Sequence, residues 1–332
     1  MAPMLDLNFV LKNDSSPEAT VESLLEFWNK ALFNPWQEVS NRPSKAIRGQ
    51  FVQLGWHLAG SPALTNSETL LKISEIIETI HLGSLIIDDI QDNSLERRGG
   101  PTLHQMHGVP LALNLGNFLY FQALSQITSL DVSADYKNAA MKQITLTLRD
   151  AHLGQALDVS VPIDQVERQT IPKLVETNLR LKSGALMKLS VHLGALLNPH
   201  FKNWEALHCF GESYGSCLQK FDDIGNFTIK PECKKNLEDL MLRRPTWIWS
   251  VFSQHASISE WSEFYQAVQA LPATEKLASF LKTSALKQKA YSLAVEDLHQ
   301  NMEVLRDQFS LHESSVAFQM ANQLTERLCH AY

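Results

Sequence analysis

Cysteine is scarce in this 332-residue sequence, and none occurs before position 209. The four cysteines, Cys209, Cys217, Cys233 and Cys329, show no spacing typical of a zinc site. Disulfides persist mainly in oxidising compartments, and nearly two-thirds of this chain carries no thiol that could form one. We therefore expect reduced thiols in a cytoplasmic protein.

Long apolar runs and an excess of positive charge are missing as well. No apolar stretch approaches the ~20 residues that span a bilayer. The start, MAPMLDLNFVLKND, lacks the basic and apolar segments of a secretory signal. Lysine and arginine number 29 against 36 aspartates and glutamates, so the net charge is −7. Such a chain is a poor candidate for binding nucleic acid or anionic membranes.

Strand signals are nearly absent, because no alternating runs are joined by Asn-Gly or Asp-Gly turns. Helical periodicity instead runs almost from end to end. One expected helix carries a stripe at steps of three or four residues: Met141, Ile144, Leu148, His152, Gln155 and Val159. We predict an all-α bundle of about ten or more helices, forming one domain over residues 1–332.

Three carboxylates end an apolar helical run in the string LIIDDIQDNSLERRGG. Asp88 and Asp92 are four apart and share a helix face, next to Asp89. Like charges on one turn repel, so a bound cation explains them better than a solvated helix end does. Arg97 and Arg98 follow, and arginine grips phosphate with a planar fork. Magnesium takes a few carboxylates and leaves its other positions to phosphate and water, so the pattern favours a site for metal and a phosphorylated ligand.

A second cluster, Asp222, Asp223 and Asn226, lies in the string QKFDDIGN. Asn226 offers an oxygen without charge, so this cluster should bind metal more weakly than the first. Taken alone, the string fits an ordinary helix end with a Gly-Asn cap. Two acidic helix faces in one bundle change that interpretation. They predict a shared cavity in which magnesium ions clamp a diphosphate.

Basic residues stand near both acidic clusters. Lys45 and Arg48 are three apart, and we expect them to share a helix face. Further downstream come Lys182, Lys220, Lys234 and Lys235. Each alone fits a solvated surface charge. Together they supply the cations that a diphosphate site requires.

The string LIIDDIQDNSLERRGGPTLHQMHGV joins a DDxxD motif, a short gap, an Arg-Arg pair and a Gly-x-Pro-Thr turn. In this it resembles the trans-type polyprenyl diphosphate synthases, particularly geranylgeranyl diphosphate synthases of eukaryotic type. The similarity is strongest from His81 to Tyr120 and extends more loosely from Ser44 to Asp239. The resemblance implies the all-helical isoprenoid synthase fold, normally a homodimer. It also implies condensation of isopentenyl diphosphate with an allylic diphosphate.

The resemblance assigns roles to these residues. About three magnesium ions would be bound by Asp88, Asp89, Asp92, Asp222, Asp223 and Asn226. The allylic diphosphate would be bound by Arg97, Lys182 and Lys234 or Lys235. The isopentenyl diphosphate would be bound by Lys45, Arg48, His81 and Arg98. Polar residues of the cavity would be Gln155, Asp158 and Gln219. Those closest to the chemistry would be Asp88, Asp89, Asp92, Lys182 and Asp222.

Two departures from the family pattern stand out. Ser44 precedes Lys45 where the family has glycine, although the charged pair remains. After the second cluster comes LRRPTWIW, in which Arg244 can replace a family lysine. Trp247 and Trp249 are unusual there, and we expect core packing in preference to a reshaped cavity or a partner surface.

Small residues precede the first cluster, which bears on the length of the product. Gly83 and Ser84 should not block a growing prenyl chain, so we predict a product of C20 or longer, unless Phe118, Phe121 or the tryptophans limit the chain instead.

Three alternative functions remain: a terpene cyclase on the same fold, a non-catalytic partner subunit and a metal-dependent hydrolase. The residues expected to bind isopentenyl diphosphate argue against a cyclase. The complete first motif argues against a non-catalytic subunit, and the Arg-Arg turn argues against a hydrolase.

Overall fold

The computed structural model describes residues 18–62, 67–228 and 237–330, and these are almost wholly helical. The described strands, β1 (Glu96–Arg97) and β2 (Gly100–Pro101), form a single antiparallel hairpin. The prediction of an all-α bundle of ten or more helices is confirmed. The chain divides into an N-terminal unit, Met1–Lys45 with Thr79–Ala123, and a C-terminal unit, Ala46–Glu78 with Leu124–Tyr332. The single domain over residues 1–332 stays a prediction.

The N-terminal unit places the first aspartate cluster. Its elements besides the hairpin are α2 (Glu18–Trp28), the π-helix η1 (Asn29–Phe33), α3 (Asn34–Ser40), the second half of α5 (Ser67–Gln91), α6 (Leu103–His107) and most of α7 (Val109–Ser129). Its core joins α3, α5, α6 and α7 through Trp36, Val39, Ile86, Leu103, Ala112, Leu115 and Leu119. Phe118 packs edge-on against Trp36, with the ring centroids 6.0 Å apart. The end of α5 is therefore fixed by apolar packing.

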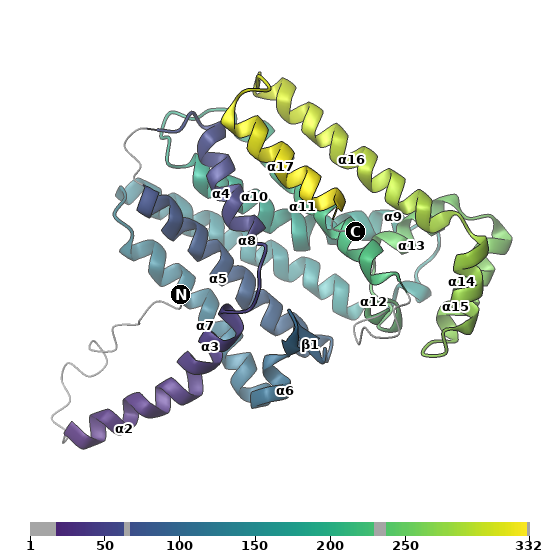
Figure 1. Cartoon of the computed structure of the whole chain (residues 1–332), viewed down its shortest axis with the longest axis horizontal. Helices are drawn as coiled ribbons and strands as arrows, with labels where there is room; N and C mark the ends of the chain where they lie inside the picture. Colours follow the sequence, from purple (N-terminus) through teal and green to yellow (C-terminus); the bar gives the residue numbers. More distant parts are fainter. Residues whose placement is uncertain (1–17, 63–66, 229–236, 331–332) are drawn as a thin grey trace. The chain divides into compact units, whose positions relative to one another are not determined.

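The C-terminal unit contains the remaining helices and the second aspartate cluster. Its first elements are α4 (Ile47–Leu58), the start of α5, α8 (Ala134–Ser160), the 3-10 helix η2 (Ile163–Gln165), α9 (Ile171–Leu179), the π-helix η3 (Arg180–Gly184), α10 (Ala185–Ala195) and α11 (Trp204–Asn226). Its later elements are α12 (Glu238–Met241), α13 (Trp247–His255), α14 (Ile258–Gln269), α15 (Glu275–Thr283), α16 (Leu286–Gln308) and α17 (Val316–His330). In Figure 1, α16 and α17 run side by side, and they contact each other.

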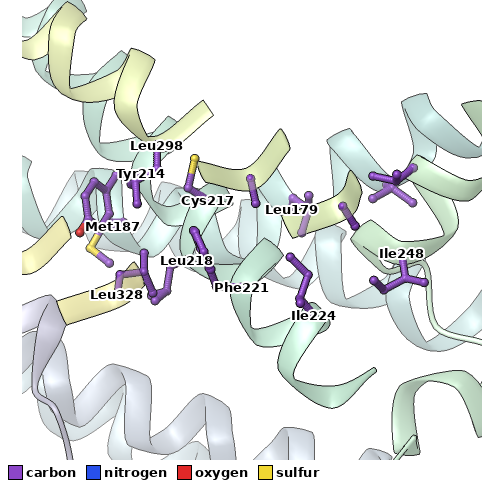
Figure 2. Packing of buried hydrophobic residues seen from close by; sticks show 14 of the residues in the cluster. Leu179, Met187, Tyr214, Cys217, Leu218, Phe221, Ile224, Ile248, Leu298 and Leu328 are labelled. Atoms are coloured by element: carbon purple, nitrogen blue, oxygen red, sulfur yellow. The ribbon is translucent and has the colours of Figure 1, made fainter. Parts of the chain in front are cut away.

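Helix α11 is the centre of the C-terminal unit. Figure 2 shows its apolar side chains meeting those of α9, α10, α13, α16 and α17, from Met187 and Tyr214 at one end to Ile224 and Ile248 at the other. Helix α10 packs against both α4 and α11. A Cβ atom at Gly55 would overlap the carbonyl oxygen of Val191, so α4 and α10 approach backbone to backbone. This dense core supports the last turns of α11, where Asp222 and Asp223 lie.

The helix that the stripe predicted is confirmed as α8, but Ile144 is the one stripe residue that is fully buried. His152 and Val159 are exposed, and the buried face runs through Tyr136, Ala140, Ile144, Thr147, Gly154 and Asp158. Small Gly154 is buried because α8 lies directly against η3, where a Cβ atom would come within 2.9 Å of the backbone nitrogen of Lys182.

No helix in the described part of the chain combines the length and the apolar character needed to cross a bilayer.

Candidate functional site

The first aspartate cluster lies at the end of α5, in the N-terminal unit. Ile86 is buried there, and Leu82 and Ile90 pack against the same core. Asp92 follows the last residue of α5, yet its N–H donates to the carbonyl oxygen of Asp88 at 2.9 Å. The expected spacing of one helical turn between these two residues is confirmed.

The hairpin brings Arg97 against this cluster. Its Nε donates to Asp89 Oδ1 at 2.8 Å, and its Nη2 lies 2.6 Å from the same oxygen. The same Nη2 is 3.6 Å from Asp88 Oδ2. Asp89 is only 4% exposed, so a guanidinium takes the place of water around its charge. Arg97 thus supplies part of the counter-charge that the sequence assigned to a metal cation.

Arg98 lies at the tight turn of the hairpin. It adopts the left-handed conformation, with φ 53°, and Gly99 follows with φ 78°. Two consecutive positive φ values suit the turn of a two-stranded hairpin. Arg98, Arg97 and Asp89 line one small pocket of about 20 Å³, room for about one water molecule. The two arginines predicted to bind diphosphates therefore share one pocket.

The fit to magnesium rests on the carboxylates of this cluster. No three His, Cys, Asp or Glu side chains in the described ranges converge as a ready-made metal site. Magnesium does not require one, because it uses one or two carboxylates and completes its shell with water and phosphate oxygens. Since Asp89 is engaged with Arg97, Asp88 and Asp92 fit such an ion best. Their role as ligands stays a prediction.

In the second cluster, on α11, Asp223 is held by hydrogen bonds. Its Oδ1 accepts from Gln219 Nε2 at 2.9 Å, and its Oδ2 accepts from the backbone N–H of Trp247 at 2.7 Å. Gln219 Oε1 in turn accepts from Ser183 Oγ at 2.7 Å. Trp247 is the first residue of α13, so the carboxyl group of Asp223 lies at the N-terminus of that helix. Asp222 is half-buried beside it.

The surroundings of Asp223 disfavour its charged form. Burial raises the pKa of Asp223 well above its usual range, and the negative charges of Asp239 and Asp222 raise it further. The hydrogen bonds from Gln219 and from the N–H of Trp247 lower this pKa without cancelling the increase. A cation near the second cluster would relieve this repulsion.

Asp239 belongs to this cluster but was missed in the sequence. Asn226 Nδ2 donates to Asp239 Oδ2 at 2.8 Å. The amide oxygen of Asn226, Oδ1, is therefore its atom suited to a metal. Helical spacing could not have revealed Asp239, since it lies 13 residues beyond Asn226. The adjacent acidic pair Glu238 and Asp239 was the available signal. Helix α11 extends through Asn226 to a C-cap at Phe227, so the Gly-Asn cap interpretation was wrong.

Lys182 is held by a second set of hydrogen bonds. Its Nζ donates to Asp158 Oδ2 at 2.8 Å, while Asn178 Nδ2 donates to Asp158 Oδ1 at 2.9 Å. Nη1 of the buried Arg244 donates to the carbonyl oxygen of Asp158 at 2.9 Å. Lys182 lies in the π-helix η3, and single π-helical turns often mark functional sites. The structure thus joins Lys182 and Asp158, and it adds Asn178.

One expectation about the basic residues was wrong. Helix α4 begins at Ile47, immediately after Ala46, which is left-handed with φ 44°. Lys45 is exposed and precedes the helix, whereas Arg48 lies in the first turn. They do not share a helix face, because Ala46 interrupts the helical backbone between them.

The remaining predicted residues lie on different elements. His81 is half-buried on α5, and Gln155 is half-buried on α8. Lys234 and Lys235 lie outside the described residues. The roles assigned to all four stay predictions.

The two tryptophans belong to the packed core, as expected. Trp249 is fully buried. Trp247 is partly buried against the same core, and its Nε1 donates to the carbonyl oxygen of Ala290 at 3.0 Å. Lys220 Nζ lies 4.2 Å from the centroid of the Trp247 ring. The core-packing prediction is confirmed.

The small size of Gly83 serves helix packing. A Cβ atom at Gly83 would lie 2.9 Å from the carbonyl oxygen of Gly116 and 3.3 Å from Cε1 of Tyr120, both on α7. Tyr120 was not among the predicted residues. Burial, with a smaller contribution from the charge of Asp88, raises the pKa of Tyr120 to about 12. The space next to Gly83 is therefore filled by α7, and Tyr120 lies close to the first cluster.

Comparisons with known proteins identify relatives of this chain. The sequence matches the family model described as polyprenyl synthetase over residues 29–283. It is 33% identical over 147 residues to geranylgeranyl pyrophosphate synthase 2 of Zymoseptoria tritici, and 31% identical over 198 residues to geranylgeranyl pyrophosphate synthase olcC of Penicillium canescens. These matches cover 44% and 60% of this chain. They cover 41% and 55% of the two relatives, so the chain spans about half the length of the curated relatives it matches.

The fold resembles those of solved synthases. A geranylgeranyl pyrophosphate synthase from Corynebacterium glutamicum, complexed with isoprenyl diphosphate and magnesium, aligns with a TM-score of 0.73 over 87% of each chain. The sequence identity is 18%, so the likeness concerns the fold. The prediction of an isoprenoid synthase fold is confirmed.

Proposed function

The chain belongs to the polyprenyl synthetase family, and we propose that it condenses isopentenyl diphosphate with an allylic diphosphate to give a product of C20 or longer. The observation that carries this function is the guanidinium of Arg97, 2.6 Å from Asp89 and 3.6 Å from Asp88. It sets a phosphate-binding fork beside carboxylates that suit magnesium. A metal-bound diphosphate needs both groups together.

The first step is ionisation of the allylic carbon–oxygen bond, which leaves negative charge on the departing diphosphate. Arg97 is held by Asp89 at the end of an apolar helix, so it can stabilise that charge with little reorganisation. Magnesium, when bound, neutralises further charge on the leaving group. Asp88 and Asp92 would hold it at the first cluster. At the second, the carbonyl oxygen of Asn226 would join Asp222 and Asp223.

The second step forms the carbon–carbon bond. The double bond of isopentenyl diphosphate attacks the allylic cation, and a proton then passes to the released diphosphate. Lys182 would bind the allylic diphosphate, because its ammonium is fixed by Asp158. The isopentenyl diphosphate would be bound by Lys45, Arg48, His81 and Arg98. Water must be excluded while the cation exists, since it would quench the cation to an alcohol.

We also propose that the chain acts as a homodimer. On α7 the exposed fractions of Val109, Leu113 and Phe121 are 46%, 44% and 71%. These residues follow a row of positions four residues apart, which turns slowly around the helix and is apolar except at the exposed Asn117. An exposed apolar ridge of this kind suits the self-complementary surface of a twofold dimer.

A product assay tests the proposed reaction. The purified chain is incubated with magnesium, isopentenyl diphosphate and each of dimethylallyl, geranyl and farnesyl diphosphate, and the products are separated by length. We expect products of C20 or longer from farnesyl diphosphate. A product pool that stops at C15 would contradict the proposed length.

Two other outcomes would replace the proposed reaction. A hydrocarbon or alcohol formed from one allylic substrate alone would indicate a terpene cyclase. No turnover alone, together with a changed product length of an added active synthase, would indicate a partner subunit.

A further inference from the structure

Arg42 lies three residues before Lys45 and was not among the predicted site residues. It follows α3, and its side chain is 13% exposed. Nη1 of Arg42 donates to the carbonyl oxygen of Arg97 at 3.0 Å and to that of Pro101 at 2.8 Å. These carbonyls belong to opposite strands of the hairpin. One guanidinium therefore bridges β1 and β2.

The contact is closely fitted. A Cβ atom at Gly100 would lie 3.1, 3.2 and 3.3 Å from Cζ, Nη2 and Nη1 of Arg42. Such similar distances place the guanidinium flat against the bare Cα of Gly100. Nη2 also lies 3.7 Å from Glu38 Oε1 and 3.7 Å from Met106 Sδ. Helix α3, helix α6 and the hairpin thus meet at one side chain.

The hairpin needs such support. Its strands are two residues each, and an isolated short hairpin is marginally stable in water. Arg97 carries the guanidinium that contacts Asp89, and Arg98 occupies the left-handed turn. Asp89 holds the side chain of Arg97, and Arg42 holds its backbone carbonyl. Because both the side chain and the backbone of Arg97 are held, the positions of Arg97 and the adjacent Arg98 are fixed.

We infer that Arg42 is a positioning residue, which fixes the hairpin so that Arg97 and Arg98 bind the diphosphate groups of the substrates. This inference rests on the proposed prenyl transfer. Arg42 lines the same small pocket as Arg97 and Arg98. It acts through the backbone, and its planar guanidinium is required: a lysine ammonium could donate to both carbonyls, as Nη1 does, but it has no flat face to pack on Gly100.

Three variants test this role. Arg42→Leu keeps the apolar bulk and removes the donors, and Arg42→Lys keeps only the charge. Gly100→Ala does not change Arg42 itself. Its new Cβ atom would lie too close to Cζ of Arg42, so it pushes the guanidinium away from β2. The matched control is Arg168→Leu. Arg168 also donates to two backbone carbonyls, those of Ser253 and Ala256, but it lies in the C-terminal unit and neither partner is a predicted site residue.

Two measurements are made on each variant in the full chain. Hydrogen exchange reports the protection of the amides in residues 95–102. Calorimetry with magnesium and inorganic pyrophosphate reports anion binding without turnover. Arg42→Leu is expected to increase exchange in that segment and to weaken pyrophosphate binding by about tenfold, the usual scale for an outer-shell partner. Arg42→Lys and Gly100→Ala should change both in the same direction, and Arg168→Leu should change neither.

Steady-state kinetics adds the readout of the reaction itself. Arg42→Leu should raise KM for the diphosphate substrates more than it lowers kcat. Weaker pyrophosphate binding with unchanged exchange in residues 95–102 would mean that Arg42 contacts the anion directly, which overturns the inference. Wild-type binding and exchange in Arg42→Lys would overturn it too, since charge alone would then suffice. If the wild-type chain shows no prenyl transfer, the proposed function fails, while exchange and pyrophosphate binding still decide the role of Arg42.

Discussion

Asp88 and Asp89 are neighbours in sequence with different surroundings. Asp89 is 4% exposed and holds Arg97 through one oxygen, whereas the Asp88 side chain is 21% exposed with Arg97 3.6 Å away. Replacing Asp88 should therefore affect the chemistry more than the fold. Replacing Asp89 should affect both, because it leaves a guanidinium facing a neutral amide.

The first prediction compares Asp88→Asn with Asp89→Asn. We expect Asp88→Asn to lower kcat by about 10²-fold or more, since it weakens charge stabilisation in the transition state, with little change in the urea midpoint. Asp89→Asn should in addition lower the free energy of unfolding by about 1–3 kcal/mol, the scale of a lost charged hydrogen bond. Denaturation curves and turnover of both variants check this. Equal stability of the two variants, or near-normal turnover of Asp88→Asn, would contradict it.

A buried histidine pair makes stability depend on pH. Nδ1 of His192 lies 2.8 Å from Nε2 of His208. Burial, and then the neighbouring His208, lowers the pKa of His192 to about 3, and burial also lowers the pKa of His208. The unfolded chain binds protons below pH ~6.5, where the folded chain does not. The stability that these neutral rings contribute is therefore complete above pH ~6.5 and is lost as the pH falls.

The second prediction concerns this slope. Between about pH 6 and 4, His192 should lower the free energy of unfolding by up to about 1.4 kcal/mol per pH unit. His192→Gln removes the titrating ring, so its stability should fall less steeply over that range. Urea denaturation of both proteins at half-unit pH steps measures the two slopes. Parallel curves would show that His192 titrates alike in the folded and unfolded chains.

For single residues, the candidate site residues could be predicted from the sequence, but their contact partners could not. The spacing of Asp88 and Asp92 and the Arg-Arg pair were readable, because helical periodicity and motif order lie in the local sequence. The roles of Arg42 and Asp239 were not, since each depends on contacts with residues 55 and 13 positions away. Long-range contacts of this kind follow from tertiary packing alone.

Among the elements, α5 and α7 show how close packing overrides simple expectations. Gly83 suggested open space for a growing prenyl chain, but α7 fills that space with Gly116 and Tyr120. Helix α8 likewise hides Gly154 and Asp158 and exposes His152. Periodicity predicts that a helix has a buried face. It does not identify that face where small residues allow backbones to touch.

The third prediction follows from the contact between α5 and α7. Gly83→Ala places a Cβ atom 2.9 Å from the carbonyl oxygen of Gly116, so the two helices must separate. We expect a loss of about 1–3 kcal/mol in the free energy of unfolding, as for other overpacked cores. The control is Ser84→Ala, which loses only the hydroxyl bond to the His81 carbonyl oxygen, on the order of 1 kcal/mol. Chemical denaturation compares them, and a Gly83→Ala midpoint equal to that of the control would exclude the steric argument.

For the whole molecule, the sequence predicted the helical class well and the organisation less fully. The family motifs and the end-to-end periodicity sufficed for an all-α isoprenoid synthase fold. The division into two compact units was not foreseen, because α5 and α7 each contribute residues to both units. A helix that continues through such a boundary leaves no proline-rich or polar linker to mark it.

The fourth prediction concerns assembly. If the ridge of Val109, Leu113 and Phe121 on α7 forms the dimer surface, a charge at its most exposed member should separate the subunits. Phe121 is 71% exposed, so Phe121→Asp should cost the monomer little and yet bury an unpaired carboxylate in the dimer, which is strongly unfavourable. Light scattering after size exclusion should give the mass of a dimer for the wild type and of a monomer for Phe121→Asp. Ile258→Asp on α14, at a residue that is 86% exposed, serves as the control and should stay dimeric. A dimeric Phe121→Asp would move the interface away from α7, because no buried apolar contact could accept that charge without a partner.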